Sequence, residues 1–172
     1  MPLPKAVLAK YKNDVFVETG TLYGEAIRMA LDAGFKHVYS IDIDSIRISS
    51  LRPAMAGSPV SLYSGSSADI LPAILPEIAG RITFWLDAHP AGNVLTLENT
   101  PVKGELAAIE AYMSRTPVDQ YPTIMLDDMR LFTQEARDYI VGRLGCWPGL
   151  VSYEDTHIAS ADIMVYKPGT LV

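Results

Sequence analysis

The stretch Val15-Phe16-Val17-Glu18-Thr19-Gly20-Thr21-Leu22-Tyr23-Gly24 decides the fold of this chain. Its apolar beginning predicts a buried strand, and the glycine turn that follows leads directly into a segment with helical periodicity. A strand, a glycine turn and a helix in this order form the ligand-binding corner of a doubly wound α/β domain. Because an acid at position 18 lies beside that turn, where like charges about 4 Å apart repel by about 1 kcal/mol in water, the pattern disfavours a pyrophosphate and favours a cationic ligand.

Length and composition predict a single compact domain over residues 1–172. Of the 172 residues, 49% are apolar and 20% are charged, which is enough to bury a full core. The net charge of -6 argues against nucleic acid or an anionic membrane as a partner and favours a small-molecule ligand. We find no apolar run long enough for a signal peptide or a membrane span, so we expect a cytoplasmic protein. Cys146 is the only cysteine, which excludes an intrachain disulfide, and we expect its thiol to be buried near Trp147.

Apolar runs and helical patterns alternate along the chain, which predicts a parallel sheet with helices on both faces. The run Ile82-Thr83-Phe84-Trp85-Leu86 is almost continuously apolar and predicts a central strand. Strands are expected near residues 14–18, 37–42, 60–64, 82–87, 123–127, 150–154 and 161–167. Helices are expected near residues 5–11, 22–33, 45–54, 67–77, 101–115 and 133–144. The fold class is therefore α/β, as a doubly wound three-layer sandwich.

The connection from Ala88 to Thr100 is long for a compact domain. Connections of this length commonly line or gate a ligand site, and we expect this one to do so. The alternative is a flexible surface insertion.

Acidic residues stand at the ends of four predicted strands. Because the carboxyl ends of parallel strands meet at one edge of a sheet, where ligands of such sheets bind, we expect these acids to share one crevice. Each acid taken singly is also compatible with ordinary turn chemistry. The four strand ends carry Glu18, Asp42, Asp87 and the pair Asp127 and Asp128.

Four segments, Phe16–Gly24, Val38–Asp42, Phe84–His89 and Leu126–Phe132, occur in an order that carries a family resemblance. Together they resemble a bacterial and phage branch of the class I S-adenosylmethionine-dependent methyltransferase superfamily. The resemblance covers most of the chain. It implies a mostly parallel seven-stranded sheet whose last strand, over residues 161–167, is antiparallel.

The same resemblance implies a cofactor-binding set. Gly20 and Gly24 would let the backbone approach the methionine part of S-adenosylmethionine, while Glu18 would face its ammonium group. Asp42 would accept hydrogen bonds from both ribose hydroxyls. Ser66 departs from the pattern, because many members carry an acid there beside the adenine amino group, so adenine recognition here would be weaker or would use backbone groups. The implied set is Glu18, Gly20, Thr21, Gly24, Asp42, Ser66 and Asp87.

Methyl transfer to a weakly acidic hydroxyl needs a positioned general base or a metal ion. Asp87, Asp127 and Asp128 could hold Mg²⁺ or another divalent cation through their oxygens, as in the metal-dependent O-methyltransferases, although an Asp-Asp pair can also simply end a strand. Asp87 and His89 are the candidate catalytic residues, with His89 as general base because its ordinary pKa is about 6.5. A solvated loop histidine is the alternative.

Two further residues have open roles. Glu105 either points into the crevice or provides negative charge at the start of its helix. Arg130 either binds an anionic group of the substrate or neutralises Asp128.

The leading hypothesis is an O- or N-methyltransferase that acts on a small molecule, with or without a divalent metal. A protein of the same fold that binds the cofactor or a partner without catalysis is the second hypothesis, and a nicotinamide-nucleotide-binding protein is the third. We see no additional helices or inserted cap of the kind that selects substrates in these enzymes. A homodimer could replace the missing lid.

Overall fold

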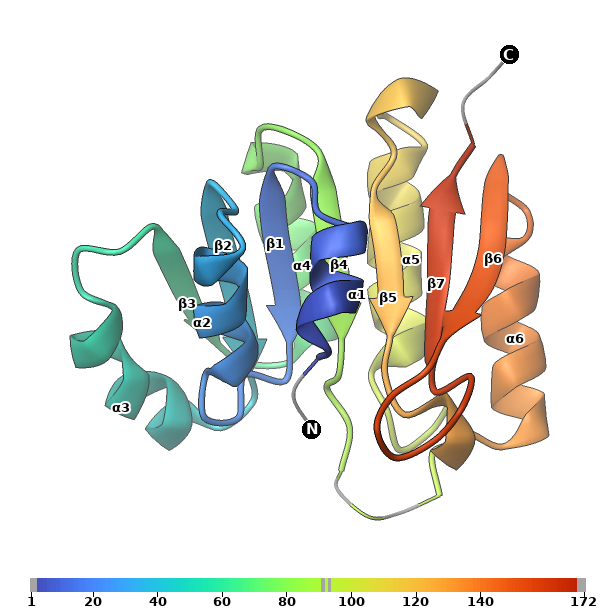
Figure 1. The fold of residues 1–172 in the computed structure, drawn as a ribbon, viewed down its shortest axis with the longest axis horizontal. Coiled ribbons are helices and arrows are strands. Elements are labelled where there is room, and N and C mark those ends of the chain that lie inside the picture. The colour runs from blue at the N-terminus through green and yellow to red at the C-terminus, as the bar shows by residue number, and fades with distance from the viewer. Residues whose placement is uncertain (1–2, 91, 93, 170–172) are drawn as a thin grey trace.

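A computed structural model describes residues 3–90, 92 and 94–169, and in it seven strands form one sheet (Figure 1). The strand order is β3-β2-β1-β4-β5-β7-β6. Strand β7 runs antiparallel to both of its neighbours, whereas β1 to β5 are paired in parallel, which confirms the expected sheet. The strands are β1 Val15–Thr19, β2 His37–Asp42, β3 Val60–Ser64, β4 Ile82–Leu86, β5 Thr123–Leu126, β6 Gly149–Glu154 and β7 Ile163–Pro168.

Helices cover both faces of the sheet, which confirms the three-layer α/β sandwich (Figure 1). One hydrophobic cluster joins the sheet to α1, α2 and α3, and a second cluster joins it to α4, α5 and α6. Successive residues of β1 point to opposite faces, so Phe16 belongs to the first cluster and Val17 to the second. The helices are α1 Lys5–Lys10, α2 Glu25–Asp32, α3 Ser45–Met55, α4 Ser67–Ile74, α5 Val102–Met113 and α6 Gln134–Leu144, with short 3₁₀ turns η1 Leu75–Glu77, η2 Val118–Gln120 and η3 Met129–Leu131.

The middle of the sheet is where its connections change direction. Strand β1 pairs with β2 on one side and with β4 on the other, and every residue of β1 and β4 is buried. The expected central position of β4 is therefore confirmed. In open α/β sheets this switch point is where the carboxyl ends of the strands leave a crevice for a ligand.

Three local expectations are corrected. Helix α2 begins at Glu25 rather than at residue 22, because Leu22 and Gly24 have φ angles of 48° and 72°, which a helix does not allow. The helix expected over 67–77 ends at Ile74 and continues as the tighter turn η1, in which Pro76 lies. Cys146 is exposed rather than buried, since it follows the end of α6 and its thiol donates to the carbonyl oxygen of Gly142 at 3.2 Å.

The connection between β4 and α5 is anchored at Leu95. This residue is fully buried and pairs with Phe132, and its N–H donates to the carbonyl oxygen of Leu131 at 2.9 Å. The connection is thereby fixed beside η3, at the carboxyl end of β5. Positions 91 and 93 of the expected loop lie outside the described residues. Within residues 3–90, 92 and 94–169, no helix combines the length and the apolar character that a membrane span requires.

Candidate functional site

The turn after β1 approaches the end of β4 very closely. Gly20 has a φ of 87°, and its N–H donates to the carbonyl oxygen of Ile41 at 2.8 Å. A Cβ atom at this position would lie only 2.4 Å from the carbonyl oxygen of Asp87. Glycine is therefore required at position 20 both for the backbone conformation and for the close approach.

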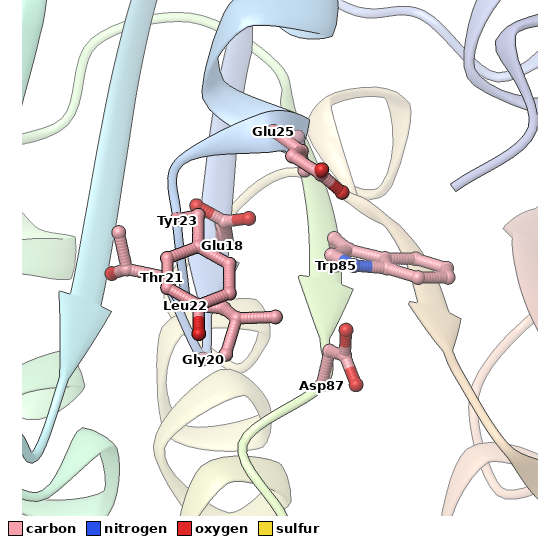
Figure 2. A pocket seen from close by; sticks show the side chains of 9 residues that line it. Glu18, Gly20, Thr21, Leu22, Tyr23, Glu25, Trp85 and Asp87 are labelled. Carbon is pink, nitrogen blue, oxygen red and sulfur yellow. The ribbon is translucent and has the colours of Figure 1, made fainter. Parts of the chain in front are cut away.

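A pocket lies between this turn, the start of α2 and the end of β4. Figure 2 shows Glu18 and the turn on one side, with Trp85 and Asp87 on the other. Glu25, in the first turn of α2, adds a further carboxylate to the lining. The pocket is therefore rich in carboxyl groups. Its lining residues are Glu18, Gly20, Thr21, Leu22, Tyr23, Glu25, Ala26, Trp85 and Asp87.

Glu18 is a buried carboxylate in this pocket without a cationic partner. It is 2% exposed and accepts a hydrogen bond from Ser40 Oγ at 2.5 Å, while Thr21 Oγ1 lies 2.6 Å from the same Ser40 oxygen. Burial raises the pKa of Glu18 to about 8; the Ser40 bond lowers it, and the negative charges of Asp87 and Asp42 raise it further. Among the described residues, no lysine or arginine side chain forms an ion pair with Glu18. A ligand cation would relieve this electrostatic cost.

Asp42, the last residue of β2, joins two loops at the edge of the pocket. Its Oδ1 accepts from the N–H of Asp44 at 2.8 Å, and its Oδ2 accepts from the N–H of Leu22 at 3.1 Å. Arg47 Nη1 lies 3.8 Å from Oδ2. Since a carboxylate offers about four acceptor positions, two backbone bonds leave acceptor capacity for hydroxyl groups of a ligand.

For three residues of the expected cofactor set, the structure shows less direct access to a ligand. Thr21 lines the pocket, but its hydroxyl is engaged with Ser40. Gly24 is not among the lining residues; it starts α2 with positive φ, and a Cβ there would lie 3.2 Å from the Leu51 side chain, so local packing explains this glycine. Ser66 stands at the start of α4, and its hydroxyl makes no capping bond.

His89 lies between two carboxylates at the ends of β4 and β5. Its Nε2 is 3.0 Å from Asp87 Oδ1 and 3.4 Å from Asp128 Oδ2. Burial lowers the pKa of His89, but the charges of Asp87 and Asp128 outweigh burial and raise it above the ordinary value of 6.5. The arrangement can hold a proton on the imidazole, or it can present one nitrogen and two oxygens to a cation.

The expected metal ligands Asp87, Asp127 and Asp128 are divided between two clusters of possible donors. Within the part of the chain that the structure describes, donor atoms of Asp87, His89 and Asp128 lie within 4.8 Å of one another, and so do those of Asp127, Asp128 and Asp162. Asp127 therefore does not complete a cluster with Asp87. Asp128 follows Asp127 in a left-handed conformation, with φ of 54°.

Asp127 is a second buried acid of the rim. It is 2% exposed, and its Oδ1 has no hydrogen-bond partner among the described residues. Burial raises the pKa of Asp127 to about 7, and the charges of Asp87 and Asp128 contribute in the same direction.

Glu105 points inward from the first turn of α5. It is 2% exposed and accepts a hydrogen bond from Ser67 Oγ, at the start of α4, at 2.6 Å. Burial raises the pKa of Glu105 to about 7. Gly104 allows this contact, because a Cβ there would lie 2.5 Å from the Cβ of Ala68. Of the two expected roles, the inward-pointing one matches the position of this side chain.

Arg130 forms ion pairs with acidic side chains, which matches one of its two expected roles, the neutralisation of Asp128. Its Nη1 lies 2.5 Å from Asp128 Oδ1 and also pairs with Asp162, which is fully buried at the start of the segment leading into β7.

Several solved structures that resemble this chain are methyltransferases. An amino pentose methyltransferase from Micromonospora echinaspora, involved in calicheamicin biosynthesis and solved with S-adenosylmethionine, is 12% identical with a TM-score of 0.60, covering 96% of this chain and 90% of that chain. An rRNA methylase from Streptococcus thermophilus is 16% identical with a TM-score of 0.55, covering 94% and 91%. The O-methyltransferase TomG from Streptomyces achromogenes, involved in tomaymycin synthesis and also solved with S-adenosylmethionine, is 12% identical with a TM-score of 0.61, covering 96% and 78%. The chain has the class I methyltransferase fold.

At these identities the likeness extends to the class I methyltransferase fold and not to the bacterial and phage branch. No protein-family model matches the sequence, and no curated protein matches it.

On the class I methyltransferase fold, the residues expected from the sequence fall into two neighbouring groups. Glu18, Gly20, Thr21 and Asp87 line the pocket, with Asp42 at its edge. His89 and Asp128 lie on the other side of Asp87. The sequence reasoning missed Glu25, Trp85, Ser40, Ser67 and Asp162. Among these, Glu25 had a usable signal, since it follows the glycine turn directly.

Proposed function

We propose that the protein is an S-adenosylmethionine-dependent methyltransferase that acts on an oxygen or nitrogen of a small molecule. The observation that carries this proposal is the buried Glu18 carboxylate, which has no cationic partner among the described residues and borders a pocket on a class I methyltransferase fold. Two of the similar solved structures hold S-adenosylmethionine. The net charge of -6 favours a small acceptor over RNA, although one similar structure is an rRNA methylase.

The residues of the pocket suit the parts of this cofactor. Glu18 would bind its ammonium group, because that group supplies the missing positive charge. The free acceptor positions of Asp42 would bind the ribose hydroxyls. The Ser66 hydroxyl, which makes no cap bond, would face the adenine side. When bound, the cofactor supplies an electrophilic methyl group on a sulfonium.

Asp87 and His89 are the proposed catalytic residues. Nε2 of His89 lies within 3.4 Å of carboxylate oxygens of Asp87 and Asp128, which would orient the imidazole electrostatically. In its neutral form His89 would accept the proton of the acceptor hydroxyl or amine as a general base. Asp87 would then stabilise the imidazolium that results.

The side chains of Asp87, His89 and Asp128 could instead bind a divalent cation. The donor atoms of Asp87, His89 and Asp128 fit one ion, and a set with one imidazole suits Mn²⁺, Fe²⁺ or Zn²⁺ better than Mg²⁺. A metal ligand cannot also serve as the base, so a metal titration decides the role of His89. If an ion binds there, Mn²⁺ should raise the melting temperature of the wild type but not that of the Asp87→Asn, Asp128→Asn double variant. No shift in the wild type would remove the metal from the proposal.

Calorimetry tests the cofactor assignment directly. Wild-type protein should bind S-adenosylmethionine and its demethylated product, and Asp42→Ala should weaken both by about 1.5–3 kcal/mol, as expected for hydrogen bonds to a charged group. Asp44→Ala is the control, because Asp44 caps α3 through Ile46 and Arg47 and is not assigned to the ligand. Equal affinity for NAD would instead support the nicotinamide-nucleotide alternative.

Two outcomes separate the remaining alternatives. Cofactor binding without release of the demethylated product, across a panel of hydroxyl and amine acceptors, would support a non-catalytic binding protein. Sedimentation velocity would test whether a second copy is available to cover the open pocket.

A further inference from the structure

A chain of charged contacts links the segment between β6 and β7 to the rim of the pocket. Asp162 pairs with the guanidinium of Arg130, and the same Nη1 lies 2.5 Å from Asp128 Oδ1. The other oxygen of Asp128 lies 3.4 Å from His89 Nε2. Three contacts, through Arg130 and Asp128, therefore connect Asp162 to the proposed catalytic histidine, although the two residues lie far apart in the sequence.

Asp162, at the end of this series of contacts, is held by its side chain and by its main chain. Its side chain has no exposed surface, and Oδ2 accepts a hydrogen bond from Thr156 Oγ1 at 2.8 Å. Its main chain is bound as well, because its carbonyl oxygen accepts from the N–H of Met129 at 2.8 Å and its N–H donates to the carbonyl oxygen of Glu154 at 3.1 Å. Burial of an ionised carboxylate is costly unless it is paired and hydrogen-bonded, and for Asp162 the guanidinium of Arg130 and the hydroxyl of Thr156 provide those partners.

Asp128 occupies a backbone conformation that needs support. Its φ and ψ of 54° and 35° lie in the left-handed region, which costs a non-glycine residue about 1–2 kcal/mol. The ion pair with Arg130 helps to stabilise this conformation, because it fixes the Asp128 side chain in the position that the left-handed backbone gives it. In this conformation the carboxylate faces His89.

We propose that Asp162 is a positioning residue that acts through Arg130 to hold the Asp128 carboxylate beside His89. The inference rests on the proposed function, because it assigns Asp162 to the orientation of the catalytic imidazole. Arg130 is thereby a structural link within the site rather than a group free to bind an anionic substrate.

Methyl-transfer kinetics of Asp162→Asn test this proposal. Asparagine keeps the size of the side chain and an oxygen for Thr156 but removes the charge that holds Arg130. We expect kcat to fall by roughly ten-fold or more, with KM for the cofactor within about two-fold of wild type, since only the acceptor side loses its geometry. Arg130→Met breaks the same link from a partly exposed position and should give the same loss if Asp162→Asn does not fold. The double variant should be no worse than either single variant.

Two controls separate positioning from general stability. Glu110→Gln and Arg143→Gln each break the same ion pair elsewhere on the surface, away from the contacts that hold Asp162. Both should retain kcat within about two-fold of wild type. A kcat of Asp162→Asn and Arg130→Met near that of the wild type, or an equal loss in the controls, would overturn the proposal.

Crystal structures of the variants decide the point even if no acceptor is found. In Asp162→Asn or Arg130→Met we expect Asp128 to leave the left-handed region and its contact with His89 Nε2, 3.4 Å in the wild type, to be lost. Unchanged positions would refute the role of Asp162. Failure of the wild type to bind the cofactor would instead refute the proposed function, and the two failures are distinguishable.

Discussion

Replacement of Glu18 by glutamine should stabilise the free protein at alkaline pH. Burial raises the pKa of Glu18 from 4.5 to about 8, so the native state binds a proton more tightly than the unfolded state does. The stability that this proton provides is fully present below pH 4.5 and is lost as the pH rises through about 8. Between these limits the change amounts to about 5 kcal/mol, at about 1.4 kcal/mol for each tenfold step in proton affinity.

Glutamine is a suitable replacement because it has the same shape, does not titrate in this range, and offers an oxygen to the Ser40 hydroxyl. The free energy of unfolding, measured in urea from about pH 5 to about pH 9, should therefore favour Glu18→Gln by an amount that grows with pH toward about 5 kcal/mol. Glu25→Gln is the matched control, since it removes an exposed carboxylate from the same pocket.

The same substitution should have the opposite effect on ligand binding. A cationic ligand favours the ionised form of Glu18, so binding below about pH 8 should release a proton from the wild type. Glu18→Gln should bind S-adenosylmethionine more weakly by about 1.5–3 kcal/mol, without that proton release, as calorimetry in two buffers of different ionisation enthalpy would show. Parallel stability curves for wild type and variant across the pH range would refute the reasoning.

Three substitutions test the local explanations given for the fold. Gly20→Ala should lower the free energy of unfolding, measured in urea, more than Gly57→Ala does. Both positions have positive φ, where alanine costs about 1 kcal/mol. Only the Cβ at position 20 would collide with the carbonyl oxygen of Asp87, which adds about 1–3 kcal/mol. Equal losses would contradict the close approach. Glu105→Gln should raise the melting temperature increasingly as the pH rises from 4.5 through about 7, because the proton that stabilises the buried acid is lost over that range; a gain independent of pH would count against it. Thr133→Ala should cost about 1 kcal/mol in urea unfolding, since its hydroxyl caps the first turn of α6, and no loss would mean that the cap is dispensable.

Local patterns in the sequence predicted most of the architecture. The apolar run that becomes β4 predicted a central strand, and the structure places it there with all five residues buried. The alternation of elements predicted the three layers, and the family resemblance predicted the antiparallel β7. The central strand and the layers follow from hydrophobic periodicity and turn chemistry, which short stretches of sequence contain, whereas the direction of β7 was implied by the resemblance alone.

The grouping of the acids was only partly predictable. Because parallel strands end at one edge, the sequence indicated that Glu18, Asp42 and Asp87 would lie near one another, and they do. The sequence placed His89 close to Asp87, Asp127 and Asp128, but it did not reveal that Asp128 would be shared by two clusters, one with Asp87 and His89 and one with Asp127 and Asp162.

By itself, then, the amino-acid sequence determined the α/β layering, the strand–glycine–helix corner and the accumulation of acids along one edge of the sheet. The tertiary structure alone decided which side chains meet: the contact of Ser67 with Glu105, and the link from Asp162 through Arg130 to Asp128. The physical reason is that these contacts join residues separated by long stretches of chain, and their geometry depends on helix approach and on single backbone angles that no local pattern specifies.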